Sequence, residues 1–237
     1  MKTSKHYVTV SRGRAVALPA FAFLLSLACV GFAALTVQES NKPAQESRFE
    51  TLALEVNDIP CEEQQKAIHA GWIMPLYLQD DIQWSHIDYA EGTIGDSGCG
   101  LSCAAMAIEY LTGQIVTPLD LEAIVGSTCT VYGVNDMARF GAYMSEAYGL
   151  RTSEIYYDLD RALSEITSSS VVFAGVRGEL WERAYGGHIV CIWKTDGDSV
   201  YIRDPASGAN SQHRFTAEEL RSTEWLYFYT TSKGEGR

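Results

Sequence analysis

The chain has 237 residues, of which 46% are hydrophobic and 20% charged, and its formal net charge is −12. This length and this balance are typical of one sizeable globular domain with additional segments. The excess of acidic side chains argues against a nucleic-acid partner, because such a partner requires a basic face, and it is typical of a soluble surface.

The amino-terminal part of the chain has the pattern of an export segment. Residues 15–37 contain no charged side chain, and the segment before them carries only basic charges: Lys2, Lys5, Arg12 and Arg14. At about 1.5 Å per residue, a helix over 15–37 reaches roughly 35 Å, which is enough to cross a bilayer core. Basic residues before such a span and acids after it place the body of the protein outside the cytoplasm. We therefore expect residues 1–37 to form either an uncleaved membrane anchor, which their length favours slightly, or a signal peptide cut near 31–33.

The following segment, 38–71, is predicted to be a polar tether with one short helix. Its composition turns polar between Gln38 and Arg48, and the helix is expected over 62–70. The compact domain is expected to span 72–237 and to start with an extended stretch over 73–79.

Helices dominate the first half of this domain. The run Leu101–Leu111 is apolar on nearly every side, which predicts a central, buried helix that starts at Cys99. Four further helices are predicted from their capping residues: one that starts at Thr117-Pro118, one from Asn135-Asp136 to Tyr148 before Gly149, one over 159–166 behind Asp158, and a short one behind Thr216–Glu219.

Strands dominate the second half. They are predicted at Val171–Val176, His188–Lys194, Val200–Asp204 and Trp225–Thr230. Helices that come first and an antiparallel sheet that comes later indicate an α+β fold.

The motif Ser97-Gly98-Cys99-Gly100 places a thiol at the first turn of the central helix. Unpaired backbone N–H groups and the positive end of the helix dipole favour a thiolate there. Burial of the helix would hold the thiol at a rigid position, and we expect Gly98 and Gly100 to leave room for a substrate backbone.

A histidine and an aspartate are predicted to meet at the open end of a hairpin. A three-residue loop at Thr195–Gly197 would pair Lys194 with Asp198 and, further along, His188 with Asp204. Directly opposed residues share a face, with Cβ atoms about 4.5–5.5 Å apart. Asp204 would then hold one imidazole nitrogen of His188 and leave the other for a thiol. Taken alone, the pair is more typical of a strand-end histidine next to a turn-forming Asp-Pro, and only its combination with Gly98-Cys99-Gly100 favours the catalytic interpretation.

The other groups around this chemistry are less constrained by spacing. Attack of a thiol on an amide builds an oxyanion, for which the Cys99 N–H and the side chain of Gln79 or Gln83 are candidate donors. Five cysteines lie beyond Cys29: Cys61, Cys99, Cys103, Cys129 and Cys191. We interpret Cys103 and Cys191 as core residues and leave open a disulfide between Cys61 and Cys129. The odd thiol is what a catalytic cysteine would produce in an exported protein.

In chain order, Gln79, Ser97-Gly98-Cys99-Gly100, Gly187-His188 and Asp204-Pro205 resemble the papain-fold cysteine peptidases. The resemblance covers about 74–229 and is closest to a bacterial branch similar to bacteriocin-processing peptidases, the C-thirty-nine-like group. It implies a papain-like α+β fold, in which a helical part with a buried cysteine helix packs on an antiparallel sheet.

The resemblance also implies a set of roles. Cys99 would be the nucleophile, His188 the base, Asp204 its orienter and Gln79 an oxyanion donor, acting on a peptide or protein substrate. The chain departs from the family at Leu101, where proline is frequent, and it carries no multi-span transporter such as the leader-cleaving members use. A double-glycine leader is therefore not the expected substrate.

Other functions are weighed against this one. Gly95-Asp96-Ser97-Gly98 imitates the serine motif of trypsin-like enzymes, but those are all-β and carry their histidine upstream. The histidines show no metal-ligand spacing, so we expect neither a metal nor a cofactor: His6, His69, His86, His188 and His213. Two alternatives stay open. One is a peptidoglycan amidase or endopeptidase with the same Cys-His chemistry, and the other is a tethered binding module without turnover.

Overall fold

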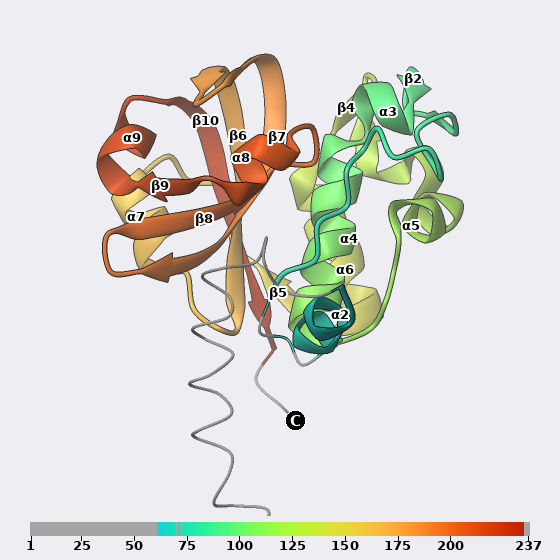
Figure 1. Ribbon diagram of the computed structural model, residues 1–237. Helices are drawn as coiled ribbons and strands as arrows, with labels where there is room; N and C mark the ends of the chain where they lie inside the picture. Colours follow the sequence, from blue (N-terminus) through green and yellow to red (C-terminus); the bar gives the residue numbers. More distant parts are fainter. Residues whose placement is uncertain (1–60, 70, 72, 235–237) are drawn as a thin grey trace, which may run out of the picture. The chain divides into compact units, whose positions relative to one another are not determined.

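The computed structural model describes residues 61–69, 71 and 73–234, and it has an α+β fold (Figure 1). The helices are α2 (Cys61–His69), α3 (Ile94–Ser97), α4 (Cys99–Thr112), α5 (Pro118–Val125), α6 (Met137–Tyr148), α7 (Leu159–Ser164), α8 (Gly208–Gln212) and α9 (Ala217–Arg221), with a 3-10 turn, η2 (Gly126–Cys129). The strands are β1 (Asp88–Tyr89), β2 (Gly92–Thr93), β3 (Thr130–Val131), β4 (Val134–Asn135), β5 (Leu150–Thr152), β6 (Ser170–Leu180), β7 (Arg183–Asp196), β8 (Ser199–Arg203), β9 (Arg214–Thr216) and β10 (Glu224–Lys233). The predicted order of helices followed by an antiparallel sheet is confirmed.

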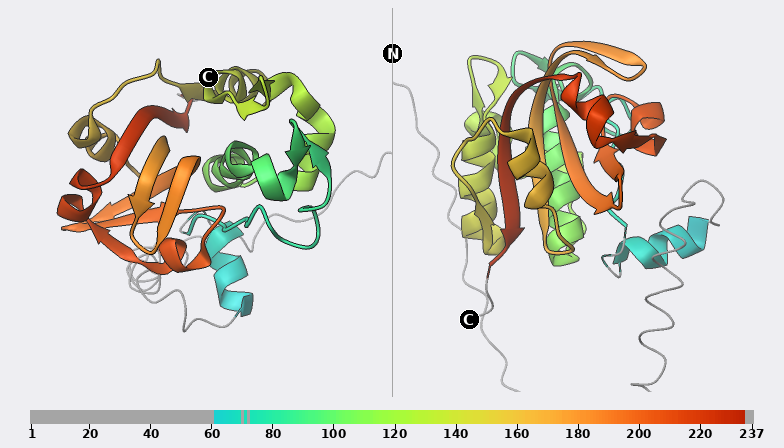
Figure 2. Two further views of the ribbon diagram at one scale, coloured as in Figure 1. Left: turned by 90° about the horizontal axis from the view of Figure 1, so that it is seen from above. Right: turned by 90° about the vertical axis from the view of Figure 1, so that its left-hand side faces the viewer.

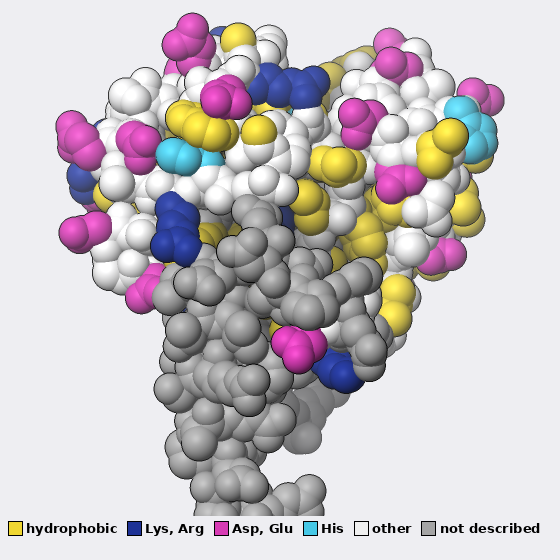
Figure 3. All heavy atoms as spheres, in the orientation of Figure 1, with side chains coloured by type: hydrophobic (Ala, Val, Ile, Leu, Met, Phe, Trp, Pro, Cys, Tyr) yellow, Lys and Arg dark blue, Asp and Glu magenta, His cyan; other side chains and the backbone are white. Residues whose placement is uncertain are grey.

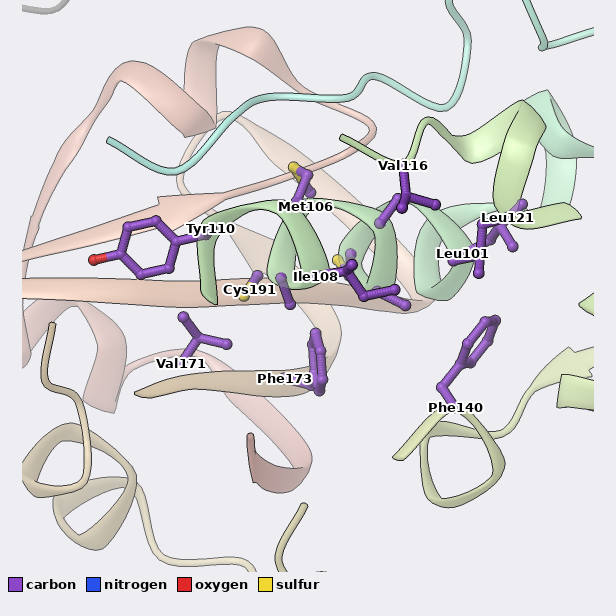
Figure 4. Close-up of a cluster of buried hydrophobic side chains, with 14 of the residues drawn as sticks. Leu101, Met106, Ile108, Tyr110, Val116, Leu121, Phe140, Val171, Phe173 and Cys191 are labelled. Atoms are coloured by element: carbon purple, nitrogen blue, oxygen red, sulfur yellow. The ribbon is translucent and has the colours of Figure 1, made fainter. Parts of the chain in front are cut away.

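The central helix α4 is buried along almost its whole length. All twelve residues from Gly100 to Leu111 are buried. Figure 4 shows Ile108 next to Phe173 of the sheet, and Leu101 near Leu121 and Phe140 of the neighbouring helices. Each fully buried side chain of this size stabilises the fold by about 1.5–3 kcal/mol. The helix ends at Thr112 and is followed by Gly113, whose φ of 74° is the left-handed conformation that glycine adopts without strain.

The other helix starts follow the capping residues that the sequence predicted. Thr117 and Asp120 form a capping box with proline at the start of α5, and the Asp136 side chain accepts two backbone N–H groups of α6. Asp158 caps α7, which ends at Ser164 and is therefore two residues shorter than predicted.

One six-stranded antiparallel sheet forms the second half of the fold. Its strand order is β5-β10-β6-β7-β8-β9, and the views in Figure 2 show α4 and α6 on one face with α7 and α9 at the other. Because both faces are covered, Ser170–Val176 of β6 are buried at every position. Successive side chains of β6 pack in two separate hydrophobic clusters, one on each face of the sheet. Phe173 packs in the cluster that contains α4, and Val172 packs in the cluster that contains residues of α7 and α9.

The predicted register of the β7–β8 hairpin is wrong by three residues next to the turn and by two further along. Ile192 pairs with Ile202, where the prediction had Val200, and the turn has two residues, 197 and 198, because Asp196 pairs with Ser199. A bulge at Trp193 shifts the ladder. The indole of Trp193 is buried 5.7 Å from the ring of Tyr110, with the guanidinium of Arg203 above it at 5.0 Å. The two-residue turn is therefore the main difference from the prediction, and the bulge at Trp193 takes back one residue of the shift.

His188 also does not open its strand, as the sequence had suggested. Strand β7 starts five residues earlier, at Arg183, and pairs with β6 as far as Leu180. The register shifts between the pairs Val176–His188 and Gly178–Tyr185, and the two glycines before the histidine lie in this irregular part of the ladder.

Several predictions concern residues that the structure does not describe. The export segment over 1–37 and most of the tether lie outside the described residues, and so does the side chain of Cys61. Cys129 is a free, buried thiol. Within 61–69, 71 and 73–234, no helix has the length and hydropathy needed to span a bilayer.

On the face seen in Figure 3, acidic side chains are spread over both halves and do not form a single patch.

Candidate active site

Cys99 is the first residue of α4 and lies half-buried at the junction with α3. Thr93 and Asp96 form a capping box on α3, and Gly98 follows as the last residue of that turn. Helix α4 then begins with a hydrogen bond from the Ser102 N–H to the Gly98 carbonyl, 2.9 Å long. Local capping and burial therefore hold the thiol at a rigid helix start, as the sequence predicted.

The two glycines that flank Cys99 make room for the protein itself. A Cβ at Gly98 would lie 2.4 Å from the carbonyl oxygen of Ile94, and a Cβ at Gly100 would lie 2.6 Å from the Cβ of Asn135. The prediction that both glycines admit a substrate backbone is therefore wrong. They are needed because α3 and β4 approach the start of α4 closely.

Gly100→Ala is consequently expected to destabilise the fold by about 1–3 kcal/mol, because the added methyl group overpacks the contact with Asn135. The measurement is thermal unfolding, with Gly208→Ala as the control, since a Cβ at Gly208 meets nothing within 4 Å. An unchanged melting temperature together with a raised KM would restore the role in substrate access.

His188 and Asp204 lie in hydrogen-bond contact. The Nε2 atom of His188 is 2.9 Å from Oδ1 of Asp204, and both side chains are almost completely buried. Cys99 lies close enough to His188 for its side chain to raise the pKa of the imidazole. Because Nε2 faces the carboxylate, Nδ1 is the nitrogen left for the thiol. The structure thus brings Cys99, His188 and Asp204 together from α4, β7 and the end of β8.

The charges of this group favour a protonated histidine. Burial alone would lower the pKa of His188, but the hydrogen bond to Asp204, the nearby side chain of Cys99 and the charges of these two groups raise it from 6.5 to about 9. Burial would likewise raise the pKa of Asp204, yet hydrogen bonds from His188 and Tyr185 hold it below its usual range. A negative Asp204 and a positive His188 are therefore the stable pair at neutral pH.

Both oxygens of the Asp204 carboxylate accept hydrogen bonds from neighbouring groups. Its Oδ2 accepts hydrogen bonds from the Tyr185 hydroxyl at 2.5 Å and from Nδ2 of Asn210 at 2.8 Å, while Oδ1 accepts the Ala206 N–H at 2.9 Å. The ring of Tyr185 also stacks on that of His188, with centroids 4.2 Å apart and planes 13° from parallel. Tyr185 thus covers the imidazole and contacts its carboxylate partner, which fixes the geometry of both.

Gln79 lies against the segment that precedes Cys99. Its Nε2 donates to the Gly95 carbonyl at 2.7 Å, and its backbone N–H donates to Pro205, one residue beyond Asp204, also at 2.7 Å. Gln79 is 8% exposed, whereas its rival Gln83 is on the surface. Gln79, and not the exposed Gln83, therefore connects the segment before Cys99 with the loop after Asp204.

A buried arginine ties the same parts together. Arg203 donates from Nε to the Met74 carbonyl at 2.9 Å and from a terminal nitrogen to the Ser211 carbonyl at 3.0 Å. Burial lowers the pKa of Arg203 to about 10, so the guanidinium stays charged at neutral pH. It connects the stretch that leads to Gln79 with the helix that carries Asn210.

The remaining described thiols are unsuited to nucleophilic chemistry. Cys103 is fully buried, donates to the Ile189 carbonyl at 3.4 Å, and has its pKa raised well above the usual value by burial. Burial raises the pKa of Cys191 and of Cys129 as well. The interpretation of Cys103 and Cys191 as core residues is confirmed.

Three residues of the site were not predicted from the sequence. Asn135, interpreted only as part of a helix start, places its amide at the Cys99 sulfur, and Tyr185 and Asn210 both contact Asp204. The only available signal was for Tyr185, which lies three residues before the histidine. Within the described part of the chain, no group of three or more His, Cys, Asp or Glu side chains is arranged to hold a metal ion.

Comparison with known proteins decides the family. The chain matches the Peptidase_C39 like family over residues 57–233, which is well over half of its length. It belongs to this family. The match includes all the residues of the Cys99–His188–Asp204 group and Gln79, and it agrees with the resemblance seen in the motifs.

Solved structures add distant likenesses to this member of the C39-like peptidases. A candidate C39-like peptidase from Bacillus anthracis is 14% identical, with a TM-score of 0.47, over 69% of this chain and 96% of that one. The G161 and R161 variants of the Salmonella effector SpvD are 14% and 11% identical, with TM-scores of 0.33, over 80% of this chain and 100% of theirs. A search of curated proteins found no match.

Proposed function

We propose that this protein is a cysteine peptidase that cleaves peptide bonds through Cys99, His188 and Asp204, on the outer side of the cytoplasmic membrane. The observation that carries the proposal is that the Cys99 sulfur, the His188 imidazole and the Asp204 carboxylate lie next to one another. The half-buried side chain of Cys99 lies close enough to His188 to raise its pKa, and Nε2 of His188 lies 2.9 Å from Oδ1 of Asp204. Proposed export rests on the uncharged run 15–37 behind a basic start.

In the proposed reaction, the thiolate of Cys99 attacks the carbonyl carbon of the peptide bond while His188 is protonated. The negative charge that develops on the carbonyl oxygen is stabilised by the Cys99 N–H and by the side-chain amide of Gln79. The C–N bond then breaks as His188 gives its proton to the leaving amine, which leaves a thioester on Cys99.

Water completes the cycle. His188, now neutral, takes a proton from water, and the resulting hydroxide attacks the thioester carbonyl. The C–S bond breaks, the acid product departs, and the thiolate and imidazolium pair is restored. Asp204 stays ionised throughout and holds the imidazole in position.

Labelling of intact cells tests both the chemistry and the location. A membrane-impermeant peptide probe with a thiol-reactive group is expected to label Cys99 in whole cells, and the label should vanish in His188→Ala, because the protonated imidazole supports the thiolate. Labelling that requires cell lysis would contradict the proposed location. A protein that remains unlabelled under both conditions but still binds the peptide would be a binding module.

Cleavage profiling then identifies the class of substrate. Proteome-derived peptides and peptidoglycan fragments are incubated separately with wild-type protein and with Cys99→Ala. We expect new amino termini in the peptide sample that are absent with the variant. Cleavage of the peptidoglycan fragments alone would identify an amidase or endopeptidase of the cell wall.

A further inference from the structure

Asn135, the last residue of β4, makes a direct contact with the reacting sulfur. Its Nδ2 lies 3.6 Å from Sγ of Cys99 and donates a second hydrogen bond to the Ser97 carbonyl at 2.7 Å. Its Oδ1 accepts a hydrogen bond from the Tyr89 hydroxyl at 2.7 Å. The side chain is 9% exposed and so is largely shielded from water.

These partners determine which way the amide points. The Ser97 carbonyl only accepts hydrogen bonds, so the nitrogen of the amide, and not its oxygen, must face it. With Oδ1 held by Tyr89, both protons of Nδ2 are available, one for the Ser97 carbonyl and one for the sulfur. Asn135 therefore acts on Cys99 as a hydrogen-bond donor.

The surrounding backbone is arranged to bring this amide to the thiol. Strands β3 and β4 are joined by a two-residue turn in which Tyr132 and Gly133 have φ values of 50° and 72°, both in the left-handed region. The tip of this hairpin packs on the neighbouring hairpin, since a Cβ at Gly133 would lie 2.8 Å from the side chain of Glu91. Only a glycine at position 100 leaves space for Asn135, whose Cβ occupies the place of the missing side chain.

We propose that Asn135 is a further catalytic residue, whose side-chain N–H stabilises the Cys99 thiolate directly. This inference rests on the proposed function. An N–H donor interacts more strongly with an anionic sulfur than with a neutral one, because the hydrogen bond to a charged acceptor is stronger. The donor is uncharged at every pH, so its effect persists when His188 has lost its proton. It would act twice, on the attacking thiolate and on the thiolate that leaves when the thioester is hydrolysed.

The test measures the rate at which iodoacetamide alkylates Cys99 in the folded protein between pH 5 and pH 9. Asn135→Asp is nearly isosteric and keeps the acceptor for Tyr89, but it replaces the donor by an oxygen. We expect alkylation near pH 7 to slow by about tenfold in this variant and in Asn135→Ala, the effect of losing one hydrogen bond to a charged group. Tyr89→Phe, which removes only the group that orients the amide, is expected to show a smaller loss.

The matched control is Tyr132→Asn on the same hairpin. Tyr132 is 93% exposed, and asparagine followed by glycine suits this turn, so alkylation is expected at the wild-type rate. Wild-type rates in folded Asn135→Asp across the pH range would overturn the role of Asn135. If instead Cys99 of the wild-type protein reacts no faster than a free cysteine and takes no peptide probe, the peptidase proposal itself fails.

Discussion

Replacing Cys99 by serine is expected to lower peptide cleavage by roughly 10³-fold or more, because a hydroxyl beside His188 is a far weaker nucleophile than a thiolate. The fold should be unaffected, since the side chain is half-buried and similar in size. The measurement is kcat/KM on a peptide found by cleavage profiling, together with thermal unfolding.

Cys103→Ser is the matched control for this prediction. Cys103 lies one helical turn further into the core, and a serine there keeps a donor for the Ile189 carbonyl. Most of the activity should therefore remain. Comparable losses in both variants, with folding intact, would mean that the chemistry does not belong to Cys99 alone.

The second large effect concerns the pH profile of Asp204→Asn. Because the pKa of His188 is raised to about 9, the imidazolium that donates a proton to the leaving amine is present below this pH and is lost above it. The kcat/KM of the wild-type protein should therefore fall as the pH rises through about 9. Asp204→Asn removes two of the causes that raise the pKa of His188, the hydrogen bond to the carboxylate and its negative charge. Burial, which lowers the pKa of His188, remains. The falling limb should then move to lower pH.

The same variant should also lose activity at its optimum, by roughly a hundredfold, since the orientation of the imidazole is lost while the nucleophile survives. An amide at position 204 accepts at one atom only, so either Tyr185 and Asn210 or His188 and Ala206 lose their acceptor. A lower melting temperature is therefore expected as well. The shift of the pH limb is independent of that loss. An unshifted limb at wild-type rates would remove Asp204 from the mechanism.

The hairpin that carries His188 shows how far pattern and pairing rules reach. The two residues were expected to be neighbours, and they are, although the register differs from the prediction by two residues. Side chains alternate along a strand, so an even shift leaves Asp204 on the same side of the ribbon as His188, in the diagonal position. The direct opposition was lost because the turn has two residues, 197 and 198, in place of the predicted three-residue loop at 195–197.

The sequence by itself determined the features that depend on neighbouring residues: the helix caps, the burial of α4, the position of Cys99 at its start, and the α+β order of elements. These follow from rules that act within a few residues of the chain. Only the tertiary structure decided which side chains complete the site. Asn135, Tyr185 and Asn210 come from β4, β7 and α8, and each meets a partner that lies far away in the sequence or on another element. The packing of whole helices and strands positions such groups, and no local pattern records it.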